Sequence, residues 1–271
     1  GSKIEFKGKE YVVRDLAEFD PSGLDIALFS AGGGTSKEYT PRFAEAGCYV
    51  IDNSSTWRMH DDVCLVVPEV NPDAVAQFKN RGIIANPNCS TIQMLVALKP
   101  IYDAVGISRI NVCTYQAVSG TGKEAIDELQ KQTSDLLNMR PVSTSVYPKQ
   151  IAFNALPQID VFQDNGYTRE EMKMVWETRK ILEDDSIMVN PTCVRVPVFY
   201  GHSEAVHIET CEKISAAAVR TLFDECAAIE VIDGLEDGAY PTAVSEAAGE
   251  DPVYVGRIRE DISHPQGINM W

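Results

Sequence analysis

The 271-residue sequence contains no apolar run close to the roughly 20 residues that a membrane-spanning helix needs. Its first residues, Gly1-Ser2-Lys3, do not open an apolar secretion signal either. Neither a membrane protein nor a secreted one is indicated. We therefore expect a cytoplasmic protein.

Basic residues are scarce. The chain has 24 Lys and Arg against 40 Asp and Glu, which gives a net charge of −16. Binding to nucleic acid or to an anionic membrane requires a basic surface, so neither is expected as a partner. Small anionic ligands remain possible, because they need only a few well-placed cations.

The cysteines lack the close spacing of a zinc site or a disulfide framework. Their number is odd, seven, and no CxxC occurs. We expect no metal site. Five of them lie in or beside apolar, strand-like runs and are interpreted as small buried side chains: Cys48, Cys64, Cys113, Cys193 and Cys211.

Short apolar runs alternate with helix-like stretches in the first part of the chain. The runs are Asp25 to Phe29, Tyr49 to Ile51, Leu65 to Val67 and Ile83 to Ile84. A helix is predicted from Lys37 to Ala46, after the only glycine cluster, Gly32-Gly33-Gly34. This alternation is typical of a parallel sheet covered by helices.

The pattern changes after Cys89. Helices are predicted from Ser90 to Ala104, Lys123 to Leu137, Arg169 to Leu182 and Ala216 to Ala227, the third opened by a capping box at Thr168. Strands are predicted at Ile110 to Tyr115, Cys193 to Phe199, Ala205 to Glu209 and Val253 to Ile258. They indicate a second domain with a mainly antiparallel sheet. We place the domains at 1–88 and 89–271.

Cys89 differs from the other cysteines in its position. Asn86-Pro87-Asn88 ends a strand and leads directly into a helix. The unpaired N–H groups and the dipole at a helix N-terminus stabilise a thiolate and an oxyanion formed beside it. A buried cysteine that merely packs under the helix would fit the same position, and position alone favours neither interpretation.

Of the four histidines, His202 is the best candidate for an acid or base. His60 lies in a charged stretch, His264 in a turn, and His207 inside an alternating strand where packing is the simpler role. His202 lies between two strand runs, where active-site groups are often presented. Arg195, seven residues earlier, interrupts an apolar run and is costly to bury unless it holds an anion. The pair favours a carboxylate site beside an acid/base.

Four segments together resemble the aspartate-β-semialdehyde dehydrogenases. They are Asn86 to Thr91, Thr114 to Gly120, Phe153 to Gln158, and Arg195 to Val198 with Gly201 to Glu204. They occur in the family's order along essentially the whole chain. Glyceraldehyde-3-phosphate dehydrogenases carry Cys-Thr-Thr-Asn instead, and N-acetylglutamyl-phosphate reductases carry Gly before their Cys.

The resemblance implies a role for each matching residue. Cys89 is the nucleophile, His202 the acid/base, and Gln116 positions the thioester. Substrate contacts are implied for Arg195 with the α-carboxylate, Glu170 with the amino group, and Lys173, Arg58 and Asn88 with phosphate. Cofactor contacts are implied for Ser30, Gly32, Thr35, Ser119 and Gly120. Without the resemblance, Glu170 and Lys173 would be interpreted as a solvated ion pair, and Arg58 as a surface charge.

The resemblance also implies an α/β fold, an NADP(H) cofactor and a homodimer. It predicts a Rossmann-type domain followed by an α+β catalytic and dimerisation domain. The implied reaction is the NADPH-dependent reductive dephosphorylation of β-aspartyl phosphate to aspartate semialdehyde through a Cys89 thioester. That reaction belongs to the biosynthesis of lysine, methionine and threonine from aspartate.

The chain departs from the family pattern at its ends. The Gly-Ala-Thr-Gly-x-x-Gly turn that seats the pyrophosphate has no match, and the family's last strand and helix lie beyond Trp271. We therefore expect a chain truncated at both ends, with weak or no cofactor binding. Two alternatives follow: an inactive fragment that serves as a dimerisation or interaction module, and a reductase of another acyl phosphate.

Overall fold

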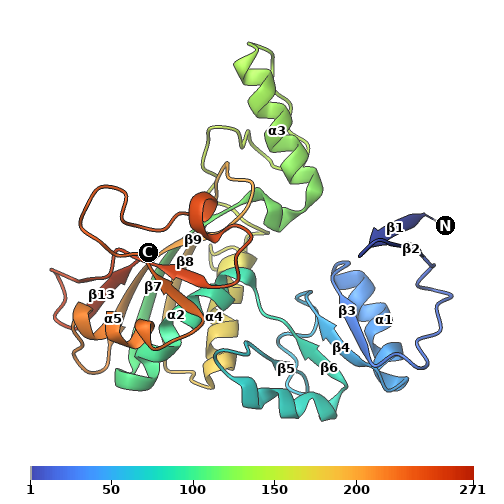
Figure 1. Cartoon of the computed structure of the whole chain (residues 1–271), viewed down its shortest axis with the longest axis horizontal. Coiled ribbons are helices and arrows are strands. Elements are labelled where there is room, and N and C mark those ends of the chain that lie inside the picture. The colour runs from blue at the N-terminus through green and yellow to red at the C-terminus, as the bar shows by residue number, and fades with distance from the viewer. Residues whose placement is uncertain (1) are drawn as a thin grey trace. The chain divides into compact units, whose positions relative to one another are not determined.

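The computed structural model describes residues 2–271, which form two compact units (Figure 1). The N-terminal unit comprises residues 2–66 and 71–87, and the C-terminal unit comprises 67–70 and 88–271. Each contains its own sheet. Within the described residues, no helix combines the length and the apolar character needed to cross a bilayer.

The N-terminal unit contains the predicted parallel sheet. Its four strands, in the spatial order β3-β4-β6-β5, are β3 (Ile26–Phe29), β4 (Tyr49–Asp52), β6 (Ile83–Ala85) and β5 (Cys64–Leu65), and every neighbouring pair is parallel. The helical segments are α1 (Gly33–Glu45) and the 3₁₀ segment η1 (Pro72–Asn80). Helix α1 begins earlier than predicted, because two of the three clustered glycines form its first turn.

An N-terminal hairpin was not predicted from the sequence. Strands β1 (Lys3–Phe6) and β2 (Lys9–Val12) pair antiparallel across Lys7 and Gly8. Both turn residues have positive φ, 49° and 74°, as a two-residue hairpin turn requires. Polar and apolar residues alternate in Lys3 to Phe6, ahead of the turn at Lys7 and Gly8, so the sequence carried a hairpin signal even though all eight strand residues are exposed.

The C-terminal unit is built on a five-stranded, mainly antiparallel sheet, as predicted. In spatial order its strands are β12 (Arg259–Glu260), β13 (Gly267–Met270), β9 (Ser203–Thr210), β7 (Ile107–Gln116) and β8 (Met188–Arg195). Only β7 and β8 pair in parallel. A separate parallel pair joins β10 (Ile229–Val231) to β11 (Val253–Val255).

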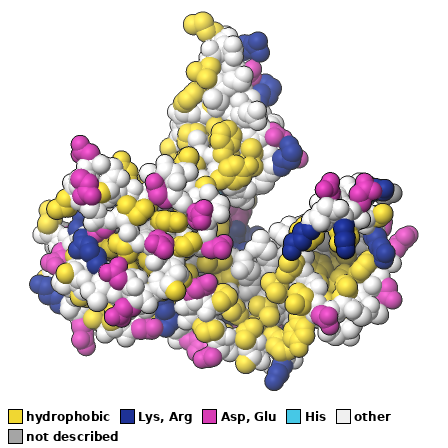
Figure 2. All heavy atoms as spheres, viewed as in Figure 1, with side chains coloured by type: hydrophobic (Ala, Val, Ile, Leu, Met, Phe, Trp, Pro, Cys, Tyr) yellow, Lys and Arg dark blue, Asp and Glu magenta, His cyan; other side chains and the backbone are white. Residues whose placement is uncertain are grey.

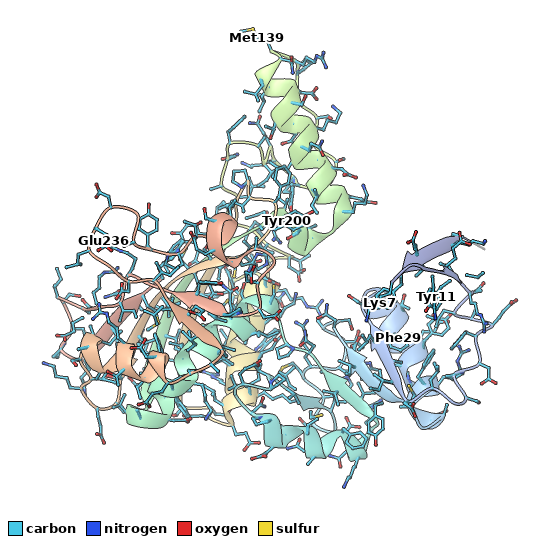
Figure 3. All side chains as sticks on the ribbon, in the orientation of Figure 1. Lys7, Tyr11, Phe29, Met139, Tyr200 and Glu236 are labelled. Atoms are coloured by element: carbon cyan, nitrogen blue, oxygen red, sulfur yellow. The ribbon has the colours of Figure 1, made fainter. Side chains whose placement is uncertain are left out.

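Helices cover one face of this sheet. Helix α2 (Cys89–Val105) packs on β7 and β9, α4 (Arg169–Leu182) packs on β8, and α5 (Ala216–Asp224) packs beside α2. Figure 2 shows acidic side chains spread over the visible face of this unit, with basic side chains among them. Helix α3 (Lys123–Leu137) extends away from the sheet, with Met139 at its outer end (Figure 3). Short helical turns are η2 (Val118–Thr121) and η3 (Ala243–Ala247).

Strand β8 differs from the predicted strand at Cys193 to Phe199. It runs from Met188 to Arg195 and therefore includes Pro191. A proline has no N–H to donate, but β8 is an edge strand, where this loss is tolerated. Leu156 forms an isolated bridge with Arg195, and the following Val196 and Pro197 leave the sheet.

The cysteines follow the expectation only in part. Cys48, Cys64 and Cys193 are buried, and Cys113 is half-buried. The prediction was wrong for Cys211, which is exposed. This residue lies one position beyond the end of β9, where the chain leaves the sheet.

Candidate active site

Cys89 is the first residue of α2, as the sequence predicted. Asn88 caps the helix: its side-chain oxygen accepts hydrogen bonds from the N–H groups of Ser90 at 3.0 Å and Thr91 at 3.2 Å. The Cys89 side chain is exposed and lines a cavity of about 390 Å³. The nucleophile expected from the sequence is therefore open to a small molecule.

The surroundings of Cys89 disfavour a thiolate in the resting protein. Protein atoms packed around the thiol raise its pKa to about 11, and the nearby Glu170 carboxylate adds to this rise. The Ser90 N–H acts in the opposite direction but is outweighed. The helix N-terminus favours the thiolate, as expected, but by less than the packed surroundings and Glu170 oppose it, so Cys89 rests as a neutral thiol.

His202 lines the same cavity as Cys89. Its Nδ1 accepts a hydrogen bond from the backbone N–H of Ala117 at 3.0 Å, so the neutral ring carries its proton on Nε2. Burial and the neighbouring Arg195 lower its pKa to about 4. At pH 7 His202 is thus an uncharged imidazole whose free ring nitrogen is a proton donor.

Gln116 and Asn88 join the cysteine helix to Glu170. Gln116 ends β7 and is buried, and its amide donates to Ser90 Oγ at 2.7 Å and Glu170 Oε1 at 3.4 Å. The Asn88 amide donates to the same Glu170 oxygen at 2.8 Å. The network fixes both amides beside Cys89, where they can orient an acyl group.

Glu170 and Lys173 form an ion pair, with 3.0 Å between Nζ and Oε2, and Lys173 also contacts Asp160 at 3.0 Å. The interpretation as a solvated pair is wrong, since only 8% of the Glu170 side chain and 16% of the Lys173 side chain are exposed. Burial alone would raise the pKa of Glu170. Lys173, Asn88 and Gln116 reverse that effect and hold it below the usual range.

Arg195 ends β8 and is buried, as an anion-binding arginine on an apolar strand should be. Its Nη1 donates to the Ala117 carbonyl at 2.7 Å, while its Nε has no hydrogen-bond partner among residues 2–271. An unpartnered buried guanidinium nitrogen is costly, and a carboxylate from a ligand would satisfy it.

Gly120, in η2, faces both Arg195 and His202. A Cβ at this position would lie 3.2 Å from His202 Nε2 and 3.3 Å from Arg195 Nη1. Any larger residue would crowd both groups. The glycine therefore keeps space open beside the imidazole, and the neighbouring Ser119 belongs to the same turn.

The remaining predicted residues lie in the N-terminal unit. Arg58 is buried and donates to the carbonyl groups of Asn86 at 2.8 Å and Asn53 at 3.1 Å, which overturns its interpretation as a surface charge. Ser30 and Thr35 line a cavity of about 730 Å³ within this unit.

Gly32 opens α1 and suits a phosphate-bearing cofactor. It has a φ of 90°, and no side chain caps the N–H groups of the helix. A Cβ added at Gly32 or Gly34 would meet no non-neighbouring atom of the described residues within 4 Å. Free N–H groups at an uncrowded helix N-terminus can receive a dinucleotide phosphate, so the residues present fit such a cofactor.

Sequence reasoning missed two buried carboxylates. Glu177 accepts the backbone N–H of Asn88 at 2.6 Å and so holds the helix cap of α2. Its spacing of seven residues from Glu170 places both on one face of α4, a signal that was available. Glu204 was noted only as part of a motif, yet it is buried and lines the cavity of Cys89.

Comparison with known proteins bears directly on this site. The family model "Semialdehyde dehydrogenase, NAD binding domain" matches residues 1–78, and "Semialdehyde dehydrogenase, dimerisation domain" matches 98–271. The aspartate-semialdehyde dehydrogenase of Legionella pneumophila is 64% identical over 271 residues, covering 100% of this chain and 78% of that protein. This chain belongs to the aspartate-semialdehyde dehydrogenase family.

Further relatives agree with this assignment. The aspartate-semialdehyde dehydrogenase of Shewanella violacea is 62% identical, covering 100% of this chain and 80% of that protein. The crystal structure of aspartate semialdehyde dehydrogenase II from Vibrio cholerae, complexed with ASA, has a TM-score of 0.97 at 61% identity, with the same coverage. The resemblance seen in the sequence is confirmed, and with it the α/β fold. As a member of the aspartate-semialdehyde dehydrogenase family, the chain is an oxidoreductase with a nicotinamide dinucleotide as cofactor.

Proposed function

We propose that this protein interconverts β-aspartyl phosphate and aspartate semialdehyde through a thioester on Cys89. The observation that carries the proposal is the shared cavity of an accessible cysteine at a helix N-terminus and a half-buried, neutral histidine. In the biosynthetic direction, Cys89 sulfur bonds to the acyl carbon while the bond from that carbon to the phosphate oxygen breaks, and the thiol proton leaves with the departing phosphate. The bound cofactor, NADPH, supplies the hydride that reduces the thioester.

The chain's own groups account for the remaining chemistry. The Nε2–H of His202 is placed to donate to the oxygen that gains charge when the acyl carbon becomes tetrahedral. Gln116 and Asn88 orient the acyl group from the other side of the cysteine helix. When the semialdehyde leaves, Cys89 sulfur departs and regains a proton, which its raised pKa favours at neutral pH.

Substrate binding is proposed to use the charged groups around the site. The unpartnered Nε of Arg195 suits the α-carboxylate, and the Glu170 carboxylate suits the amino group. Lys173 donates to Glu170 and Asp160, which leaves one of its three N–H donors for phosphate. Arg58 and Asn88 are the further phosphate ligands.

NADP(H) is the proposed form of the cofactor. The structure of an aspartate semialdehyde dehydrogenase with NADP from Candida albicans has a TM-score of 0.71 at 25% identity and covers 99% of this chain. The glycine-opened helix α1 and the turn at Ser119 and Gly120 are the proposed contacts. Seven free cysteines are in keeping with a reducing compartment, and we propose the cytoplasm.

We also propose that the protein works as a homodimer. One face of the five-stranded sheet packs against α2 and α4, while residues on the other face, such as Asn190 and Thr192, are exposed. The matched dimerisation domain covers all five strands. A second copy seated on this open face would cover it.

The reaction is tested in the oxidative direction with aspartate semialdehyde, phosphate and NADP. Absorbance at 340 nm should rise, and intact mass should show an acyl adduct on the protein when phosphate is left out. Both signals should be absent in Cys89→Ala. If absorbance at 340 nm still rises with the Cys89→Ala variant, or if the acyl adduct lies on another residue, the proposed role of Cys89 is refuted.

A further inference from the structure

Glu204 is a buried carboxyl group with too few hydrogen-bond donors around it. It lies on β9, and its Oε1 accepts a hydrogen bond from Gln93 Nε2 at 2.8 Å. Its Oε2 is buried without a partner among the described residues. A carboxylate can accept about four hydrogen bonds, so this one is left largely unsatisfied unless it is protonated.

The residue opposite Glu204 does not supply the missing donor. Thr114 pairs with Glu204 across β7 and β9, and its buried hydroxyl interacts with the Cys193 thiol instead. The cavity of Cys89 and His202 is lined by Glu204 as well.

The hydrogen bond between Gln93 and Glu204 joins the two elements that carry the reacting groups. Gln93 follows Cys89 by four residues, which places both on one face of α2. Glu204 follows His202 by two residues, and side chains two apart in an extended segment share a face. One contact therefore ties the nucleophile's helix to the histidine's strand.

We propose that Glu204 is a positioning residue that acts as a neutral carboxylic acid. It holds α2 against β9, and in its neutral form it places no negative charge beside the Cys89 thiolate. This inference rests on the proposed function, because it assigns Glu204 to the same reaction. Its geometric basis is the single donor from Gln93, the unpartnered second oxygen and the shared cavity.

The electrostatics agree with this geometry. Burial raises the pKa of Glu204 to about 8, against a smaller opposing effect of Gln93. Charge on Glu204 in turn raises the pKa of Cys89, although by less than burial and Glu170 do. The Glu204 carboxyl is therefore neutral at pH 7, and it ionises in the higher pH range in which the Cys89 thiolate begins to form.

Other ionisable groups face this region from every side. They are Cys89 on α2, Cys193 on β8, His202 before β9, Glu170 on α4, Arg195 at the end of β8, Glu250 and Asp251 on the segment leading into β11, and Tyr254 in β11. The position paired with Glu204 on β7 is the uncharged Thr114, and the uncharged Met270 of β13 lines the same cavity. The test therefore changes Glu204 alone and compares whole pH profiles.

The first experiment measures the alkylation rate of Cys89 by iodoacetamide from pH 6 to 10, quantified by peptide mass. Glu204→Gln should match the wild type below pH 7 and react on the order of threefold faster above pH 8.5, corresponding to about half a pKa unit of the thiol. The matched control is Glu212→Gln, at an exposed position two residues beyond the end of β9, which should follow the wild-type profile. Identical profiles for Glu204→Gln and wild type would overturn the proposal.

The second experiment separates positioning from general folding. Glu204→Leu should lower kcat at least about tenfold with little change in KM, and Glu204→Gln, which can still accept from Gln93, should restore it. Equal kcat losses in the two variants, or none in either, would overturn the positioning role. If Glu204→Leu fails to fold, the alkylation profile of Glu204→Gln still tests the proposal. If neither the wild type nor any variant turns over substrate, but the alkylation rates of wild type and Glu204→Gln still differ, the result counts against the proposed function and not against the role of Glu204.

Discussion

Cys89 and His202 both rest without charge, and the protein atoms packed around each group shift its pKa further toward the neutral form. Removing water from the thiol penalises its anion, and removing it from the imidazole penalises its cation. A thiolate–imidazolium pair is therefore not the ground state of this site. Attack on the acyl carbon requires the thiol proton to leave as substrate binds, and the dipole of α2 stabilises the charge at that point.

At the same scale, Lys173 is predicted to be the group that keeps Glu170 ionised. Lys173→Met leaves two carboxylates, Glu170 and Asp160, without their cation and should destabilise the protein by about 3 kcal/mol at pH 7. Urea unfolding measures this loss. The matched control is Lys131→Met, because the Lys131–Asp135 pair is largely exposed on its lysine side and its loss should cost less than about 0.5 kcal/mol.

The pH dependence of that loss has a definite sign. The pKa values of Glu170 and Asp160 are lowered, the first mainly by Lys173 against burial, the second by Lys173 and its own backbone contacts against burial. Their stabilisation is present above the unfolded-state values near ~4 and is lost as pH falls through the lower folded values. The difference between Lys173→Met and wild type should shrink below about pH 4. A constant difference from pH 7 to pH 3 would contradict this account.

Helix α4 carries two of the four charged groups proposed to bind substrate, Glu170 and Lys173. Glu170, Lys173 and Glu177 all project from it, and its first turn is fixed by a capping box between Thr168 and Glu171. The second Glu171 oxygen accepts the backbone N–H of Cys193 on β8 at 3.0 Å. The cap therefore sets both the start of the helix and its attachment to the sheet.

Thr168→Ala removes the cap and should lower stability by about 1 kcal/mol. The lost hydroxyl leaves the N–H of Glu171 without its acceptor inside the protein. Thermal unfolding followed by circular dichroism measures the change. Thr221→Ala, at an exposed position within α5, is the comparison and should leave stability unchanged or slightly increased. Equal effects of the two substitutions would show that the cap contributes nothing.

At the scale of the whole molecule, the open face of the five-stranded sheet is the surface to test. If a second copy covers it, Thr192→Arg, at an exposed position on the edge strand β8, should place a charge in the interface. Sedimentation velocity should then show a dimer in the wild type and a shift toward monomer in the variant. Thr221→Arg on α5 serves as the control, and an unchanged dimer in Thr192→Arg would remove this face from the interface.

Much of the fold was predictable because local patterns and tertiary packing agree. The parallel sheet, the antiparallel sheet and helix α3 follow from apolar runs and turn residues, and the helix prediction of Lys123 to Leu137 matches its bounds. The predictions failed where context overrides pattern. Pro191 is tolerated only because β8 is an edge strand. The hairpin β1–β2 was missed although its first strand alternates polar and apolar residues ahead of Lys7-Gly8.

The sequence by itself determined the family, the order of the two domains and the candidate residues, because motif spacing and residue type are written along the chain. Only the tertiary structure decided their charge states. The packed surroundings shift the pKa values of Cys89 and His202 further toward their neutral forms, bury the Glu170–Lys173 pair, and isolate one oxygen of Glu204. A pKa depends on the water and charges around a group, and those come from segments as far apart in the chain as Asn88, Lys173 and His202.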